Sequence, residues 1–339
     1  MKDEHLAEKN SQKLINLRGK IGTIAAISII GVFLIAIAPF VTGYVQSMIV
    51  KILIYGIFAV SLNLLWGYTG LFSLGHAAYF GVGGYVAGIL AVRYGVHSFW
   101  ILAPAGILSA GMVAAIFAFP ALRVRGSYFL LVTLALGELL FSVAIKWRAV
   151  TGGSNGLAGI PYPDLNLPGI TINSTSFYYL VLVGFAICLF VIYRIVKSPF
   201  GLSLRGIRGN PRRMSALGHH VFINKYLVFV IAGLFAGAAG VLFGPFSRIM
   251  APPHLGIMTS TLVMLMVIIG SESLVFGPVT GAAIVVLLEH FASIYIPERW
   301  PLILGGIFII SVMFLPGGVS IYLSKLWNKV FSRDIGVGS

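Results

Sequence analysis

Charged residues and cysteine are both scarce in this sequence. Only 9% of its 339 residues are charged and 58% are hydrophobic, whereas soluble domains carry roughly a quarter charged residues. Cys188 is the single cysteine, which excludes an internal disulfide framework and a cysteine-based metal site. The composition is typical of an integral membrane protein.

Motifs that would indicate chemistry within the chain are also absent. There is no G-x-x-x-x-G-K-[ST] segment, and therefore no P-loop for ATP. Neither H-E-x-x-H nor C-x-x-C occurs. His219 and His220 are adjacent, as are Glu289 and His290, and neighbours on a helix point in different directions. We therefore expect no enzyme activity, no metal site and no cofactor bound by this chain.

The formal net charge is +14. In a soluble protein, such a charge would suggest binding to nucleic acid. No RNP-like or zinc-finger pattern accompanies it here, so we expect no nucleic-acid partner. Basic loops that set the orientation of membrane spans explain the charge instead.

The apolar residues come in runs of about twenty, the length that crosses a bilayer as a helix. We predict an all-α polytopic integral membrane protein with about ten transmembrane helices and a short cytoplasmic helix. The glycine-rich run at 71–92 and the pair at 259–296 could be broken or re-entrant. The predicted spans are 21–41, 48–66, 71–92, 99–119, 127–146, 177–196, 226–246, 259–276, 279–296 and 301–323.

The distribution of lysine and arginine predicts how these spans are oriented. With the N-terminus in the cytoplasm, seventeen of the 23 basic residues fall on the cytoplasmic side and six on the outer side, in agreement with the positive-inside rule. An even number of spans then puts both termini in the cytoplasm. The predicted regions are cytoplasmic tails at 1–20 and 324–339, a transmembrane domain at 21–323, an outer loop at about 147–176 and a cytoplasmic loop at about 198–220.

The cytoplasmic loop at 198–220 is basic and is interrupted by glycine and proline. Pro211 suits the first position of a short helix, with Asn210 as its N-cap, and Gly218 suits the residue that closes it. Two interpretations stay open: a topogenic loop that binds anionic lipid, or a docking element for a cytoplasmic partner.

The segment 67–88, "GYTGLFSLGHAAYFGVGGYVAG", combines glycine with polar side chains. Ser73, His76 and Tyr79 are spaced by three and would share roughly one face of a helix, while glycines such as Gly75 allow the backbone to break. Broken helices in transporters often mark substrate sites. The segment therefore predicts part of a substrate pathway; ordinary polar packing is the alternative.

Glu138 is the clearest acidic residue within a predicted span. An ionisable group at membrane depth is costly and normally faces protein or water. Glu138 could line a pathway or bind a proton, or it could pair with an arginine and hold helices together, which is the role we favour.

Glycines spaced by four indicate close helix packing, and these pairs are Gly84–Gly88, Gly233–Gly237, Gly240–Gly244 and Gly277–Gly281.

Several blocks, taken in order from about residue 50 to 318, resemble the permeases of branched-chain amino acid ABC importers, the LivM-type subunit. The segment "GYTGLFSLGHAAYFGVGGY" is similar to a signature of that family, and "LRVRGSYFLLVTLALGE" followed by "TGGSNGLAGIP" to its middle block. "RGIRGNPRRMSALG" is similar to its cytoplasmic loop, followed by "FVIAGLFAGAAGVLFG". "FGPVTGAAIV" and "LPGG" resemble its C-terminal blocks.

The resemblance implies an importer in the bacterial inner membrane that carries branched-chain or related amino acids. Its parts would be this chain, a second, LivH-like permease, two cytoplasmic ATPases that bind ATP and Mg, and an external substrate-binding protein. The cytoplasmic loop would be the coupling loop that seats in the ATPase. The predicted coupling residues are Arg205, Arg208, Asn210, Arg212, Arg213, Ala216, Leu217 and Gly218.

Two departures from the family pattern stand out. Where the family usually has acidic residues in the loop, this chain has Pro211 and Ser215, and the arginines at 212 and 213 replace small or apolar residues. The groove that receives this loop is therefore expected to be unusually acidic. Glu272, in "GSESLVFGP", brings a charge where the family often has a glycine run, and the sequence assigns it no role.

Three other functions remain as alternatives. Related permeases handle urea or short amides, so the substrate class is open. A stand-alone secondary transporter or channel would need its own coupling-ion site, and the shortage of membrane acids argues against one. A lipid-modifying membrane enzyme would need paired carboxylates or histidines near an interface, and the sequence contains no such pair.

Overall fold

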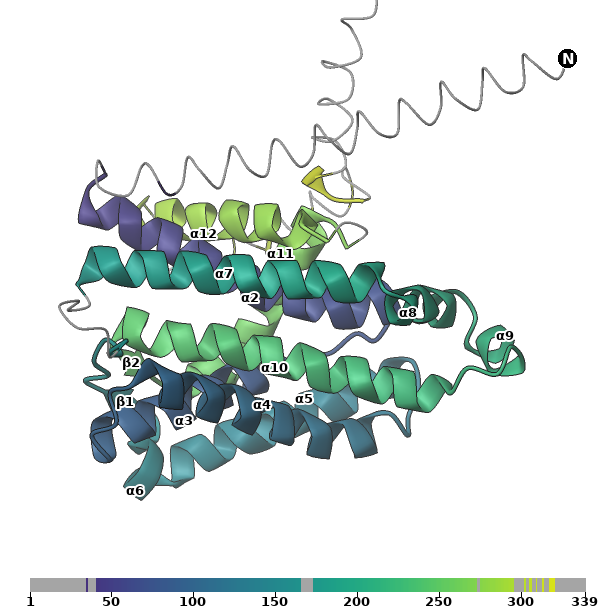
Figure 1. The fold of residues 1–339 in the computed structure, drawn as a ribbon, viewed down its shortest axis with the longest axis horizontal. Helices are drawn as coiled ribbons and strands as arrows, with labels where there is room; N and C mark the ends of the chain where they lie inside the picture. The colour runs from purple at the N-terminus through teal and green to yellow at the C-terminus, as the bar shows by residue number, and fades with distance from the viewer. Residues whose placement is uncertain are drawn as a thin grey trace, which may run out of the picture.

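The computed structural model describes residues 41–165, 173–272 and 275–295, with the single positions 35, 302, 305, 306, 309, 313 and 317–320. Six of the described helices are long and apolar enough to cross a membrane: α2 (Gly43–Thr69), α4 (Phe99–Ala121), α5 (Ser127–Lys146), α7 (Ser174–Lys197), α10 (Val221–Ser247) and α12 (Gly277–Tyr295) (Figure 1). The shorter apolar helices are α3 (Ala77–Arg93) and α11 (Ile257–Gly270).

These eight helices coincide with the eight spans predicted between 48 and 296. The predicted spans 21–41 and 301–323 and the two tails lie outside the described residues or touch only single positions, so the total of ten stays a prediction. Two spans are shorter than expected: the helix predicted over 71–92 begins only at Ala77, and the one over 259–276 ends at Gly270. Glycine lies at both places: Gly70 and Gly75 precede the start of α3, and Gly270 is the last residue of α11.

Helices α2 and α10 form the centre of the bundle. Their most apolar windows are 78% and 67% buried, compared with 17% for α7 and 22% for α5. The outer helices turn large apolar side chains outward, such as Leu108, Met112 and Ile116 on α4 and Ile187 and Phe190 on α7. Apolar side chains on the outside of a bundle are stable only in lipid or against another protein.

Glycine allows two pairs of helices, α3 with α10 and α11 with α12, to approach at backbone distance. A Cβ atom at Gly240 of α10 would lie 1.8 Å from the carbonyl oxygen of Phe80 on α3, and one at Gly281 of α12 would lie 1.8 Å from that of Met266 on α11. A side chain would push each pair of helices apart. For these two glycines, the predicted role in tight packing is confirmed.

One end of the bundle is closed by a short folded segment. It contains α6 (Arg148–Thr151), the 3₁₀ helix η2 (Gly153–Asn155) and the strand β1 (Leu157–Ala158), which pairs antiparallel with β2 (Ile249–Met250). Backbone amides of Gly159 and Ile160 also donate to the Arg248 carbonyl. This is the predicted outer loop, which is therefore more regular than its composition suggests, as far as residue 165.

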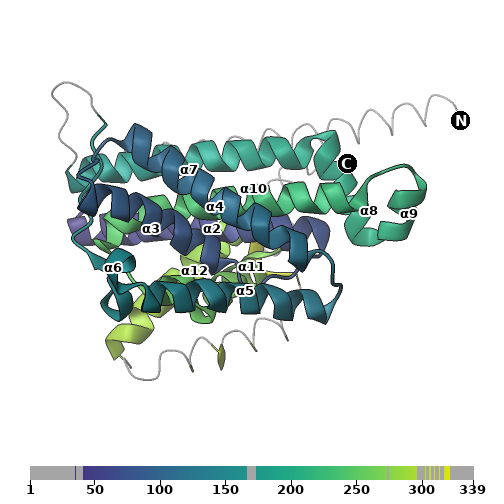
Figure 2. The same cartoon turned by 90° about the horizontal axis from the view of Figure 1, so that it is seen from below.

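A second 3₁₀ helix, η3 (Pro252–Leu255), follows β2 at the same end. The amide of Ala251 donates to Nδ1 of His254 at 3.1 Å, and burial lowers the pKa of His254. At the opposite end, α8 (Pro199–Gly209) and α9 (Pro211–Ala216) extend beyond the other labelled helices (Figures 1 and 2).

Candidate functional site

The α8–α9 pair forms a helical corner whose two starts use the same local device. Ser198 caps α8 by accepting from the amide of Gly201, and Asn210 caps α9 by accepting from the amide of Arg213 at 3.0 Å. A proline follows each cap at the first helical position. Gly218 has φ +86°, the left-handed conformation that glycine adopts readily after a helix.

The short helix predicted at 211 is therefore present, with its expected cap and closing glycine. The helix α8 before it was not predicted, because residues 199–209 were interpreted as loop. A signal for it exists in the sequence: Ser198–Pro199 is the same kind of cap and proline pair as Asn210–Pro211.

Helix α9 has no buried residue. Arg212, Arg213, Ala216, Leu217 and Gly218 are all exposed, and Leu217 exposes 69% of its surface. An exposed leucine beside two arginines, on a helix that projects from the end of the bundle, is a surface suited to contact with another molecule.

Arg205 and Arg208 are placed differently from the other predicted coupling residues, because both contact the end of α2. The guanidinium carbon of Arg205 lies 5.1 Å from the centre of the Tyr68 ring. Arg208 donates through Nη1 to the carbonyl of Gly67, and its Nη2 lies 2.5 Å from Oε1 of Glu272. The structure thus gives Glu272 a partner that sequence analysis did not identify.

The segment 70–76 is a non-helical interruption between α2 and α3. Side chains from three helices form hydrogen bonds with this segment and with the first residue of α3. The amide of Ala77 donates to the Ser260 hydroxyl on α11 at 3.0 Å, and the amide of Leu74 donates to Thr133 on α5 at 3.3 Å. His76 Nε2 lies 2.9 Å from the hydroxyl of Ser61 on α2. The Ser61 hydroxyl also lies 2.7 Å from the Phe58 carbonyl of its own helix.

The predicted pathway residues of this segment are buried. His76 is 0% exposed, and Ser73 and Tyr79 are each 2% exposed. A Cβ at Gly75 would lie 2.0 Å from the Thr133 carbonyl, and one at Gly137 would lie 3.0 Å from the Cα of Gly75. The break therefore packs directly on α5 at the residue before Glu138.

Glu138 itself is half-buried on α5 and forms no ion pair with any residue in the described part of the chain. The arginine partner considered from the sequence is not found there. Contact of Glu138, Ser73, Gly75, His76 or Tyr79 with a substrate stays a prediction.

Within the described ranges, no group of three or more histidine, cysteine or acidic side chains is arranged to hold a metal ion.

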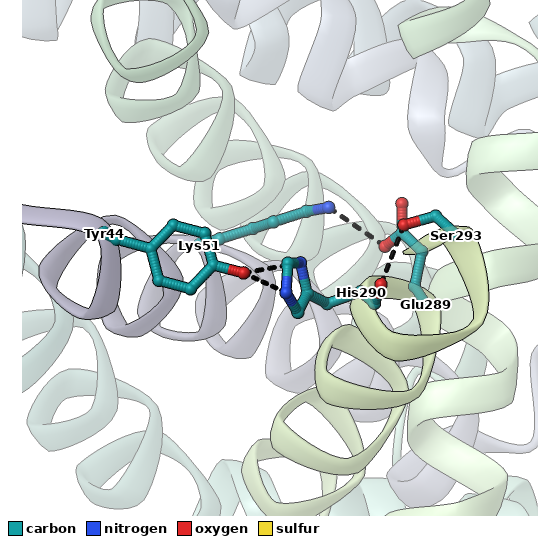
Figure 3. Close-up of polar contacts among 5 residues, drawn as sticks. All are labelled: Tyr44, Lys51, Glu289, His290 and Ser293. Carbon is teal, nitrogen blue, oxygen red and sulfur yellow. Dashed lines mark hydrogen bonds and ion pairs between the residues drawn. The ribbon is translucent and has the colours of Figure 1, made fainter. Parts of the chain in front are cut away.

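A polar cluster between α2 and α12 was missed by sequence analysis (Figure 3). Lys51 Nζ lies 3.0 Å from Oε2 of Glu289, and the hydroxyl of Tyr44 contacts the ring of His290. Lys51 is one of the six basic residues predicted on the outer side, and it lies beyond the second turn of α2, inside the helix. The available signal was the opposite charge of two residues that each sit within an otherwise apolar span.

Comparison with known proteins bears on what these features do. A family model described as "Branched-chain amino acid transport system / permease component" matches residues 44–313. The high-affinity branched-chain amino acid transport system permease protein LivM of Escherichia coli K12 is 29% identical, over 79% of this chain and 68% of that protein.

Two further relatives extend the comparison. The LivH permease protein of the corresponding system in Salmonella typhimurium is 24% identical, over 78% of this chain and 90% of that protein. A probable LivM of Methanocaldococcus jannaschii is 25% identical, over 71% of this chain and 79% of that protein. No solved structure matches the chain. Because the family model covers well over half of the chain, the chain belongs to the family of permease components of branched-chain amino acid transport systems.

Proposed function

We propose that this chain is a transmembrane permease subunit of an ATP-driven importer that carries branched-chain or related amino acids. The family match and the names of the LivM and LivH relatives support this function. The chain lacks a P-loop of its own, so the energy of ATP has to enter through contact with other subunits. Two cytoplasmic ATPases that bind ATP and Mg would supply it.

The observation that carries the proposal is the exposed helix α9 at one end of the bundle. It has no buried residue and carries two adjacent arginines. A helix that projects from the bundle and leaves all its side chains at least partly exposed is positioned to insert into a partner. We assign it to the ATPases, in a groove with acidic side chains; anionic lipid is the competing ligand for the same charges.

In this proposal, closure of the ATPases moves the α8–α9 corner as a rigid body and favours one of two states of the permease. A pathway would form between this chain and a second, LivH-like permease, bounded by the 67–88 segment and Glu138. The chain would lie in the bacterial inner membrane as about ten spans, with both termini in the cytoplasm. The end that carries β1 and β2 would face outward, where the external binding protein docks.

Purification and reconstitution test the proposed function. Purified from its native membrane, the chain should bring ATPase subunits with it, and uptake into proteoliposomes should require ATP and the external binding protein. Uptake of leucine by this chain alone, without ATP, would instead identify a stand-alone transporter. Ligand profiling of the binding protein would separate amino acids from urea or short amides as substrates.

A further inference from the structure

Arg208 connects three elements that are far apart in the sequence. It lies in the last turn of α8. One nitrogen of its guanidinium group donates to the Gly67 carbonyl in the last turn of α2, and the other pairs with Glu272, just after α11. A single side chain therefore joins the helical corner to α2 and to the turn between α11 and α12.

The chemistry of both acceptors suits arginine in particular. The Gly67 carbonyl is one of the last four of α2, which have no partner within the helix, and a cation is favourable at a helix C-terminus. Glu272 supplies a full negative charge. Guanidinium nitrogens point in fixed directions and can satisfy both acceptors at once, whereas the single ammonium of lysine would hold them less rigidly.

The backbone around the two acceptors of Arg208, Gly67 and Glu272, is closely packed. A Cβ at Gly67 would lie 2.5 Å from the Glu272 carbonyl, and one at Gly270 would lie 2.1 Å from the Gly277 carbonyl. Groups in such close contact cannot slide past one another without moving together. A displacement of Arg208 would therefore move the end of α2 and the start of α12, not one side chain.

The corner itself divides into an inner and an outer part. Leu204 and Ile207 of α8 are 0% exposed and fix that helix to the bundle, while α9 has no buried residue. Arg212 and Arg213 on α9 are free to meet a partner, whereas Arg208 points back into the permease.

We propose that Arg208 and Glu272 are positioning residues that carry the movement of the α8–α9 corner to α2 and to the α11–α12 turn. This inference rests on the proposed function, because it assumes that an ATPase moves the corner. About a third of each side chain is exposed, 36% for Arg208 and 35% for Glu272. A pair so accessible to solvent changes an equilibrium by roughly two- to fivefold, enough to alter coupling without unfolding the protein.

The test uses the complete importer in proteoliposomes and measures two quantities, amino acid transported per ATP hydrolysed and the amount of ATPase subunit that co-purifies. Glu272→Gln and Arg208→Lys should each lower transport per ATP by roughly two- to fivefold, with co-purification unchanged. Arg125→Gln is the matched control, since it removes an exposed cation from the α4–α5 connection at the same end of the bundle but leaves the Arg208–Glu272 pair intact, and it should preserve the ratio.

A charge exchange tests whether the two residues act through each other. Arg208→Glu and Glu272→Arg should each impair coupling, and the double variant should recover part of the loss. Recovery stays partial because glutamate cannot donate to the Gly67 carbonyl. A double variant no better than the worse single one would overturn the inference, as would normal coupling in Glu272→Gln.

These outcomes are separable from failure of the proposed function. If Arg208→Lys or Glu272→Gln reduces ATPase co-purification, the pair belongs to the docking surface and the positioning role is wrong, although the importer stands. If the wild-type chain transports without ATP, the proposed function fails first, and the positioning inference fails with it.

Discussion

At the residue scale, the break between α2 and α3 shows how a few hydroxyl groups permit irregular backbone inside an apolar bundle. Unpaired backbone amides in a bilayer cost several kcal/mol each. The Ser260 and Thr133 hydroxyls accept from two of the amides at this break. The backbone of the 67–88 segment thus depends on hydroxyl groups of other helices, which spacing within the segment does not reveal.

Ser260→Ala should destabilise the protein by about 1–3 kcal/mol, because it leaves the buried Ala77 amide without an acceptor. The measurement is thermal unfolding of the purified protein in detergent. Ser109→Ala is the control, since the Ser109 hydroxyl donates to a carbonyl of its own helix, that of Gly106. Equal melting temperatures for the two variants would contradict the prediction.

The pair formed by Lys51 and Glu289 makes a second prediction at this scale. Lys51→Met should cost about 1–3 kcal/mol, because the carboxylate of Glu289 loses its charged partner within a span. Adding Glu289→Gln should return part of that loss, since a neutral pair leaves no isolated charge. Unfolding of single and double variants in detergent checks both; a double variant less stable than Lys51→Met would refute the pairing argument.

At the scale of elements, α9 depends on its caps more than the long helices do. It has six residues, too few to be stable alone, and no buried side chain holds it to the bundle. The Asn210 cap and the turn at Gly218 therefore carry much of its order. The same sequence would be a loop without them.

Asn210→Ala should destabilise α9 by about 1 kcal/mol and weaken binding of the ATPase subunits by roughly fivefold. Asn210→Asp is the matched control, because aspartate keeps the side-chain acceptor for the Arg213 amide. Affinity measured between the detergent-solubilised permease and the isolated ATPase separates the two. Wild-type affinity in Asn210→Ala would show that the cap is irrelevant to docking.

At the scale of the whole molecule, charge and apolar surface are separated along the bundle. The exposed side chains of α4 and α7 are apolar over most of their length. Exposed arginines gather at the end that carries α8 and α9, where the α4–α5 connection also exposes Arg123 and Arg125. This end is suited to contact with an acidic surface, and salt should weaken that contact.

Replacing Arg212 and Arg213 together with glutamate should reduce association with the ATPases by about tenfold at low ionic strength. The effect should shrink at high salt, because screening shortens the range of the charges. Arg123→Glu with Arg125→Glu makes the same change in net charge at the same end and serves as the control. Equal losses in both double variants would point to general attraction to anionic lipid instead of docking through α9.

Much of the architecture could be predicted from the sequence, because the feature that determines it is local. A run of about twenty apolar residues has few options in a bilayer other than a helix, and each of the eight spans predicted between 48 and 296 corresponds to a described helix. Caps such as Asn210–Pro211 are equally local. The helix α8 was missed although its cap is of the same kind, because Pro199 and Gly201 were interpreted only as the end of the preceding span.

The class of the protein, the approximate spans, the capped helix at 211–216 and the family resemblance could all be inferred from residue order, since each depends on neighbouring residues or on ordered motifs. The contacts between distant side chains became visible only in the folded bundle. Lys51 and Glu289 are 238 positions apart and Arg208 and Glu272 are 64 apart, and no spacing along the chain encodes such contacts. They arise from how the helices pack: Arg205 and Arg208 contact the end of α2, whereas Arg212 and Arg213 lie on α9, which has no buried residue.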